Sequence, residues 1–432
     1  MRRHLVAAGG DNFTLFPSDG EPTVLDCAGS VDERTRCVFA ALDQRAHQTT
    51  ISGAIVATTA DGVRRSVAYE RGRRTTNVTP RTRLPAASVT KMFVAAAAVS
   101  LSQRGALDLQ RPVATYLPEL SLQRGVGRAS VHQLLTHTAG LPNPPQCTED
   151  NDIGDLVQQE GNHPLWAPPG AVFSYSNLGY TVVGAVLEAV THQPFEQVVE
   201  ERVLEPVGIA DASFDAATVE LAPQPPKGAP PTVLCRAALP SGGLVLSTED
   251  LARWGHDLAS SSPALGSEVV GPLTAPHVAT GLGPGQFYGY GVYRREIAGV
   301  TILSHGGGLV GYSSFVGWVP ERQFSVAAMA NANGGAPTGA SLLLLSTVLG
   351  IPANRPADPT PSHPLSDYAG TYVDRFGDLK TLVVSLEDDQ LVIDYPEGKP
   401  KLLPPTFRFT FSASGRPAQY VVTAAGIGQR VR

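Results

Sequence analysis

The sequence is poor in lysine and has no long apolar run. Only 5 of its 33 basic residues are lysine, and the basic block Arg71-Gly72-Arg73-Arg74 is more typical of a solvated strand end than of a nucleic-acid surface. No window of about 18 apolar residues exists, so we expect no membrane span. The early apolar run, Leu5–Ala8, is too short for a signal-peptide core. These absences predict a cytoplasmic protein without a nucleic-acid partner.

Metal-binding patterns are also missing. The four cysteines, Cys27, Cys37, Cys147 and Cys235, are scattered without metal spacing, so free thiols are the default expectation. A bridge between Cys27 and Cys37 stays open. His132 and His137 lie five residues apart, which suits one helix face poorly, and no third ligand stands near them. We therefore expect packing and loop-fixing roles for both histidines, and neither a metal nor a cofactor.

The composition is that of a globular protein with more than one domain. Hydrophobic residues make up 42% of the 432 residues and charged residues 17%. Prolines are concentrated in residues 352–364, which read as a linker. We expect an N-terminal extension over residues 1–33, a large domain over 34–351, and a small domain over 365–432.

Local patterns predict the class of each domain. Ala60-Asp61-Gly62 separates two β-rich runs, as in a hairpin, and an amphipathic helix precedes it at residues 34–48. More strand-like runs at residues 299–331 are followed by an apolar helix, which suggests one antiparallel sheet covered by helices. Short alternating runs from residue 370 to 424 predict a small all-β domain. The predicted fold class is therefore α+β.

A serine and a lysine three residues apart open a helical run that is nearly all apolar. Ser88-Val89-Thr90-Lys91 precedes the run Val94–Val99, so Ser88 should lie near the first turn of a buried helix. Residues three apart share a helix face, which lets the Lys91 amine reach the Ser88 hydroxyl. A buried amine has a lowered pKa and can act as a base, which an arginine could not do. The alternative, a capped helix with an incidental lysine, is weakened by partner motifs downstream.

Those partners are Tyr175-Ser176-Asn177 and His305-Gly306-Gly307. With Ser88-x-x-Lys91, in this order, they resemble the motifs of the serine β-lactamase and penicillin-binding-protein superfamily, most closely its class C-like branch. That branch includes esterases, D-stereospecific aminopeptidases and transacylases. The stretch 134–141 and the turn Ser241-Gly242-Gly243 also resemble this branch, and residues 367–372 resemble the start of the lipocalin-like domain of some members. The resemblance implies a transpeptidase-like fold with an added all-helical subdomain.

The resemblance also implies roles for these residues. Ser88 would be the nucleophile of an acyl-enzyme, and Lys91 and Tyr175 would share the proton transfers. Asn177 would hold Lys91 and the substrate amide, with His305, Gly306 and Gly307 as further support. The oxyanion hole would consist of the backbone N–H groups of Ser88 and Gly308.

The third motif departs from the family pattern. Most β-lactamases and carboxypeptidases have Lys-Thr-Gly there, whose cation faces a substrate carboxylate, whereas an imidazole is a poorer anchor. We therefore expect a serine acyl hydrolase or acyltransferase acting on a peptide, amide or (thio)ester, including D-residue peptides and a carrier-protein-bound acyl thioester. Two more specific hypotheses follow: a thioesterase or peptide cyclase, and a D-stereospecific peptidase or esterase. The alternatives are a β-lactamase or D-Ala-D-Ala carboxypeptidase, and a catalytically dead binding module.

Overall fold

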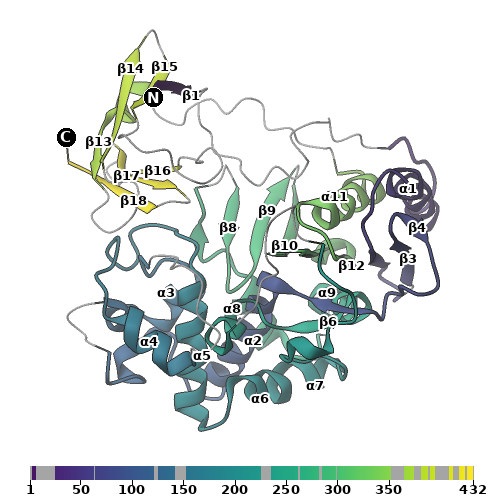
Figure 1. Cartoon of the computed structure of the whole chain (residues 1–432), viewed down its shortest axis with the longest axis horizontal. Coiled ribbons are helices and arrows are strands. Elements are labelled where there is room, and N and C mark those ends of the chain that lie inside the picture. Colours follow the sequence, from purple (N-terminus) through teal and green to yellow (C-terminus); the bar gives the residue numbers. More distant parts are fainter. Residues whose placement is uncertain are drawn as a thin grey trace.

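The computed structural model describes most of the large domain and parts of both ends of the chain (Figure 1). The described residues are 2–5, 25–62, 64–120, 125–141, 152–224, 235–260, 263–281, 285–297, 299–351, 364–373, 381–387, 390–394, 408–411, 418–423 and 426–431. Cys147, the predicted linker apart from residue 364, and most of the predicted extension lie outside these ranges.

An antiparallel sheet, called here the main sheet, forms the centre of the large domain. It contains the hairpin β2–β3, as the Asp-Gly turn predicts, and the longer hairpins β10–β11 and β11–β12. Strands from the two ends of the domain meet where β2 pairs with β12. In spatial order its strands are β4 (Arg73–Arg74), β3 (Arg64–Glu70), β2 (Gly53–Thr58), β12 (Phe324–Ala330), β11 (Tyr312–Val319), β10 (Val300–Leu309), β9 (Tyr293–Ile297), β8 (Gln286–Tyr288) and β7 (Val278–Ala279).

Helices cover both faces of the main sheet. On β2, Ile55 packs with α1 (Val31–Ala46) and α11 (Ala336–Leu349), whereas its neighbour Val56 packs into the larger core on the opposite face. Alternate strand residues point to opposite faces, so this split places one hydrophobic core on each side of the sheet. The second face carries α9 (Thr248–Ala259) and α2 (Thr90–Gln103), whose rings Phe93 and Trp254 stack with centroids 4.5 Å apart.

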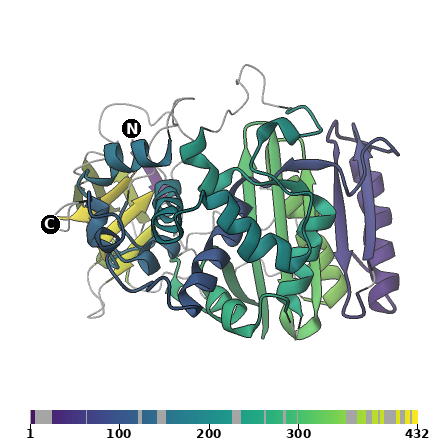
Figure 2. The ribbon, with the colours of Figure 1, turned by 90° about the horizontal axis from the view of Figure 1, so that it is seen from below.

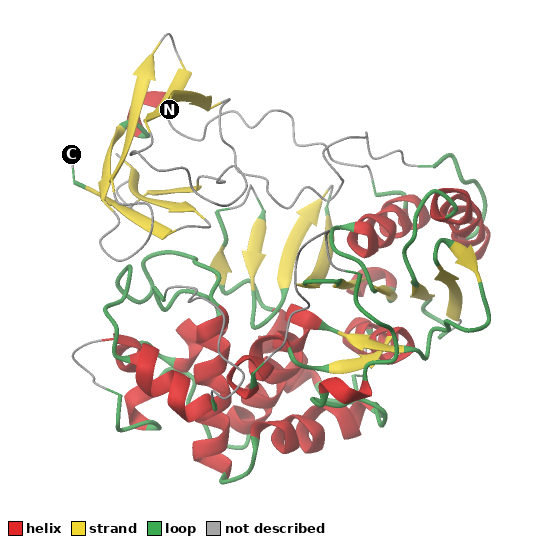
Figure 3. Cartoon of the chain, viewed as in Figure 1, coloured by secondary structure: helices red, strands yellow, loops and turns green. Residues whose placement is uncertain are grey.

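The remaining helices gather beside the second face, below the main sheet in Figure 3. They surround α2, which is buried along almost its whole length because its residues are nearly all apolar. Described helices of this all-helical part are α3 (Val131–Leu135), α4 (Ile153–Gly161), α5 (Asn177–Thr191), α6 (Phe195–Val199), a π-helical turn (Glu200–Leu204), α7 (Glu205–Val207), α8 (Leu239–Gly242) and α10 (Ser267–Thr274). A short ribbon of β5 (Arg83–Pro85) and β6 (Val245–Ser247) leads the chain into α2.

The C-terminal strands form a second antiparallel sheet, at the opposite end of the molecule from α1 (Figures 1 and 2). The N-terminal strand β1 (Arg2–Leu5) belongs to this sheet, because it pairs with β15. The predicted all-β region is thus completed at one edge by residues from the start of the chain. In spatial order the strands are β1, β15 (Gln390–Asp394), β14 (Thr381–Glu387), β13 (Gly370–Val373), β18 (Gly426–Arg430), β17 (Ala418–Thr423) and β16 (Arg408–Phe411).

The expectation of free thiols is wrong for three of the four cysteines. Cys27 and Cys37 form a disulfide, which ties the chain before α1 to the middle of that helix, and Cys235 is also disulfide-bonded. Spacing alone could not decide this, since a separation of ten residues suits a bridge only when the chain turns back. Among the described residues, no helix combines the length and the apolar character that a membrane crossing needs.

Candidate active site

Ser88 lies on a strained turn at the entrance to α2. A single 3₁₀ turn, Ala87–Val89, precedes the helix, so Ser88 lies two residues before Thr90, the first residue of α2, and near its first turn as the sequence predicts. Ala87 has a φ of +48°, in the left-handed region that costs a residue with a Cβ about 1–2 kcal/mol. Ala87 and Val89 are fully buried, but Ser88 is only half-buried. The turn therefore presents the hydroxyl of Ser88 at the surface of a buried helix.

Two neighbouring segments hold this turn through Ala86. The Ala86 N–H donates to the carbonyl of Leu244 at 2.8 Å. The Ser314 hydroxyl, on β11, donates to the carbonyl of Ala86 at 2.6 Å. Because both Ala86 and Ser314 are buried, these hydrogen bonds are shielded from water and fix the turn against the main sheet.

Lys91 lies fully buried beneath Ser88. Its Nζ is 3.2 Å from Ser88 Oγ, 2.8 Å from Asn177 Oδ1 and 2.7 Å from the backbone carbonyl of Ser241. Burial lowers the pKa of Lys91 well below its ordinary value. A neutral amine has two N–H donors, which match the two carbonyl oxygens, and one lone pair, which is then left for the Ser88 hydroxyl. The geometry therefore suits an amine that accepts a proton from Ser88.

Tyr175 approaches the same hydroxyl from the start of α5. A hydrogen bond joins its phenol to Ser88, and Lys91 Nζ lies 4.9 Å from the centre of its ring. Burial raises the pKa of Tyr175 well above its usual range, so the phenol keeps its proton at neutral pH. Ser176 caps α5 by accepting the Gly179 N–H at 3.4 Å, which places Asn177 at the first helical position facing Lys91. Ser88, Lys91, Tyr175 and Asn177 thus come together as the sequence predicts.

His305 lies on β10 and faces the interior. Its Nδ1 is 2.6 Å from the carbonyl of Gly306, which can only accept, so Nδ1 carries the proton. Its Nε2 then accepts from the Tyr288 hydroxyl at 3.1 Å. Burial lowers the pKa of His305 to about 3. The imidazole is therefore neutral, both of its nitrogens are engaged, and it presents no cation to a substrate.

The glycines after His305 allow β10 to approach the turn that carries Ser88. A Cβ on Gly307 would lie 2.3 Å from the carbonyl oxygen of Ala86 and 2.4 Å from Ser314 Oγ. A Cβ on Gly308 would meet no described atom within 4 Å, so this position faces open space. In the described part of the chain, β9 pairs with β10 only as far as Ser304, whereas β11 continues to Leu309. Beyond Ser304, one edge of β10 therefore has no partner strand among the described residues, at the place where β10 approaches the turn that carries Ser88.

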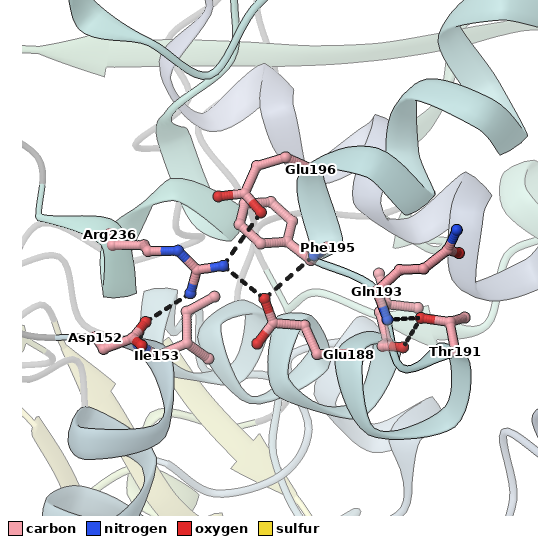
Figure 4. A network of polar contacts seen from close by, with 9 residues as sticks. Asp152, Ile153, Glu188, Thr191, Gln193, Phe195, Glu196 and Arg236 are labelled. Atoms are coloured by element: carbon pink, nitrogen blue, oxygen red, sulfur yellow. Dashed lines mark hydrogen bonds and ion pairs between the residues drawn. The ribbon is translucent and has the colours of Figure 1, made fainter.

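An ion-pair network holds the segment that supplies the Ser241 carbonyl (Figure 4). Arg236 contacts Asp152 at 2.5 Å, Glu188 at 2.8 Å and Glu196 at 3.3 Å. These three carboxylates come from the starts of α4 and α6 and from α5. Because α8 begins three residues after Arg236, at the end of a 3₁₀ turn, the network fixes the Ser241 carbonyl relative to the helix that begins at Asn177.

Several residues around the site had no predicted role. The Ser241 carbonyl is a backbone group, and only its resemblance to the family turn pointed to it. Tyr288 and Tyr293 come from short strands, and Tyr293 packs 5.3 Å from the His305 ring.

His132 and His137, which the sequence analysis singled out, contact different partners. His132 Nδ1 bonds to the Tyr290 hydroxyl, and His137 Nδ1 accepts the Ser176 N–H. The two histidines therefore have separate fixing roles, and the sequence had singled out both.

Comparison with known proteins shows the family and the fold. Residues 38–347, more than half of the chain, match the family model described as Beta-lactamase. Protein flp of Staphylococcus aureus (strain MW2) is 25% identical over 59% of this chain and 54% of its own length, so the chain spans about half of that relative. Esterase EstB of Burkholderia gladioli is 34% identical over 31% of this chain and 39% of its own. The solved structure of SurE covers 93% of this chain and 100% of its own, with a TM-score of 0.69 at 24% identity, which shows the same fold.

Proposed function

Because the chain belongs to the Beta-lactamase family, whose fold is that of serine hydrolases, we propose that it transfers an acyl group through an ester on Ser88. The observation that carries this proposal is the set of three contacts at Lys91. Two carbonyl oxygens fix the N–H bonds of the amine and leave its lone pair for the Ser88 hydroxyl. A hydroxyl in this position is activated as a nucleophile.

The proposed reaction has two halves. Lys91 takes the Ser88 proton while Oγ attacks the carbonyl carbon, and the N–H groups of Ser88 and Gly308 stabilise the oxyanion. Tyr175, which keeps its phenolic proton, passes a proton to the leaving group and is reprotonated from Lys91. Water or an amine then attacks the acyl-enzyme, with the proton transfers reversed. The free edge of β10 after Ser304 would hold the acyl chain as an added strand.

The third motif, His305-Gly306-Gly307, carries no charge, which supports a substrate that has no carboxylate beside His305. His305 has no charge and no free nitrogen, so a carboxylate beside it would lose its hydration without gaining an ion pair. This favours a neutral ester, thioester or amide over the substrates of a β-lactamase or D-Ala-D-Ala carboxypeptidase. The names of two similar proteins point the same way: EstB is an esterase, and one SurE structure holds D-Leu. A peptidyl thioester with a D-residue at the acyl carbon, free or on a carrier protein, is the substrate we propose.

The test is incubation with a peptidyl thioester that ends in a D-residue, beside its L-epimer. Acylation of Ser88, followed by intact-protein mass spectrometry, should occur with the D-form and be absent in Ser88→Ala. A cyclic product would identify a peptide cyclase, and a free acid would identify a hydrolase. A matched D-Ala-D-Ala peptide should react about tenfold more slowly with its C-terminal carboxylate free than as the methyl ester, a difference of about 1.4 kcal/mol.

A catalytically dead binding module is the alternative from another class. A fluorophosphonate or penicillin-like probe distinguishes the two, because it labels only an activated serine. A folded sample in which Ser88 stays unlabelled by every probe and thioester would contradict the proposal and favour the module.

The cytoplasmic location stays a prediction, and the disulfides count against it. Bridges such as Cys27–Cys37 persist in oxidising compartments and are rare in the reducing cytosol. Non-reducing peptide mapping of the protein from its native host would show whether the bridge forms there.

A further inference from the structure

His137 makes hydrogen bonds to the residues on both sides of Tyr175, whose phenol contacts Ser88. Its backbone carbonyl accepts the N–H of Ser174 at 2.7 Å, and its side-chain Nδ1 accepts the N–H of Ser176 at 3.1 Å. The peptide N–H groups on both sides of Tyr175 are therefore held by one residue. His137 is only 2% exposed, so these hydrogen bonds do not compete with water.

The ring of His137 also lies against the ring of Tyr175. The two centroids are 4.2 Å apart and the planes are inclined by 33°. On its other sides the imidazole packs against Phe173, Tyr180 and Tyr288. Because Nδ1 accepts a hydrogen bond, the proton is on Nε2, and burial keeps the pKa of His137 well below its ordinary value. The side chain is thus a neutral ring that packs against the ring of Tyr175.

The backbone of His137 is held in an unusual conformation to achieve this. Its φ is +56°, where a glycine would fit without steric cost. The turn alone therefore does not call for a histidine. The side chain hydrogen-bonds to the residue after Tyr175 and packs against Tyr175 and the rings around it, and these contacts account for the residue type.

We propose that His137 is a positioning residue that sets the place and orientation of the Tyr175 phenol relative to Ser88. The proposal rests on the proposed function, since Tyr175 matters only if Ser88 is acylated. It predicts an effect on the proton transfers and not on substrate binding, because His137 is buried behind Tyr175.

The test compares His137→Gly and His137→Asn in the native protein and in a Tyr175→Phe background. Glycine suits the backbone but removes the ring and the acceptor. We expect kcat to fall by about 100-fold, as for a group displaced by about 1 Å, with KM within about twofold of the native value. Asparagine tolerates the same conformation and offers an amide oxygen near the place of Nδ1. The kcat of His137→Asn should therefore be about tenfold higher than that of His137→Gly. His132→Asn, the same change in the same segment, should leave kcat unchanged.

In the Tyr175→Phe background, His137→Asn should change kcat by less than about twofold, because the phenol that it positions is already absent. A merely structural role would lower kcat equally in both backgrounds, and that result, or a native kcat in His137→Gly, would overturn the proposal. Thermal unfolding of each variant checks that the fold is kept. If the native protein were as unreactive as Ser88→Ala, the proposed function itself would fail, and this inference with it.

Discussion

Replacing Lys91 by methionine is expected to slow the acylation of Ser88 by a factor on the order of 10⁴ or more. Methionine has nearly the same length and fills the buried space, but it has no lone pair that can accept the serine proton. The two carbonyl oxygens of Asn177 and Ser241 would lose their donor, and the hydroxyl of Ser88 would lose its base. Stopped-flow measurement of phosphonylation by a fluorophosphonate probe gives the rate directly.

Lys91→Arg separates charge from basicity. Arginine keeps a cation at this position but does not give up its proton near neutral pH, so it should be as slow as methionine. Ser88→Ala provides the background rate of the probe, and circular dichroism shows whether each variant is folded. A Lys91→Arg or Lys91→Met protein that reacts within tenfold of the native rate would contradict the role of the amine.

A single methyl group on Gly307 should disrupt both the fold and the site. The Cβ of Gly307→Ala would lie 2.3 Å from the Ala86 carbonyl oxygen, a separation that forces β10 away from the nucleophile turn. Overpacking of this kind costs about 1–3 kcal/mol of unfolding free energy. Because the proposed oxyanion hole depends on the distance between the N–H groups of Gly308 on β10 and of Ser88, acylation should also fall by about 100-fold. Urea unfolding and probe labelling measure the two effects.

The neighbouring glycines are matched controls for stability. A Cβ on Gly306 would lie 3.8 Å or more from its neighbours, and on Gly308 it would meet no described atom within 4 Å. Gly306→Ala and Gly308→Ala should therefore keep the unfolding free energy within about 0.5 kcal/mol of the native value. Gly308→Ala adds a methyl group that meets no described atom within 4 Å, one residue after the closest approach of β10 to the turn that carries Ser88, so it should weaken reaction with bulky acyl groups. Equal stability of all three alanine variants would contradict the close approach of β10.

That the candidate catalytic residues lie together was predictable, because their spacing is local or their motifs are fixed. Ser88 and Lys91 are three residues apart, and Tyr175 and Asn177 stand at the start of a capped helix. The second acceptor at Lys91 is the Ser241 backbone carbonyl, whose position depends on the packing of α8 and on the Arg236 ion pairs. No residue type signals such a contact in advance.

The strained turn was not predictable for a different reason. Alanine has no preference for a positive φ, so the sequence Ala86-Ala87-Ser88 does not predict the conformation that places Ser88 before the first residue of the regular helix. The hydrogen bonds of Ala86 to Leu244 and Ser314, far away in sequence, impose it. In the same way, β1 is only four residues long and gains its partner from β15, at the other end of the chain.

The pH dependence of Ser88 acylation tests the central claim most directly. Lys91 must be neutral to accept the proton, and burial lowers its pKa, so the rate should rise with pH through one ionisation and then stay level. His305, with a pKa of about 3, and Tyr175, with its raised pKa, should add no step between pH 5 and 9. We predict this single rising limb for the native protein and a slow, level profile for Lys91→Met. The same profile in both proteins would contradict the account.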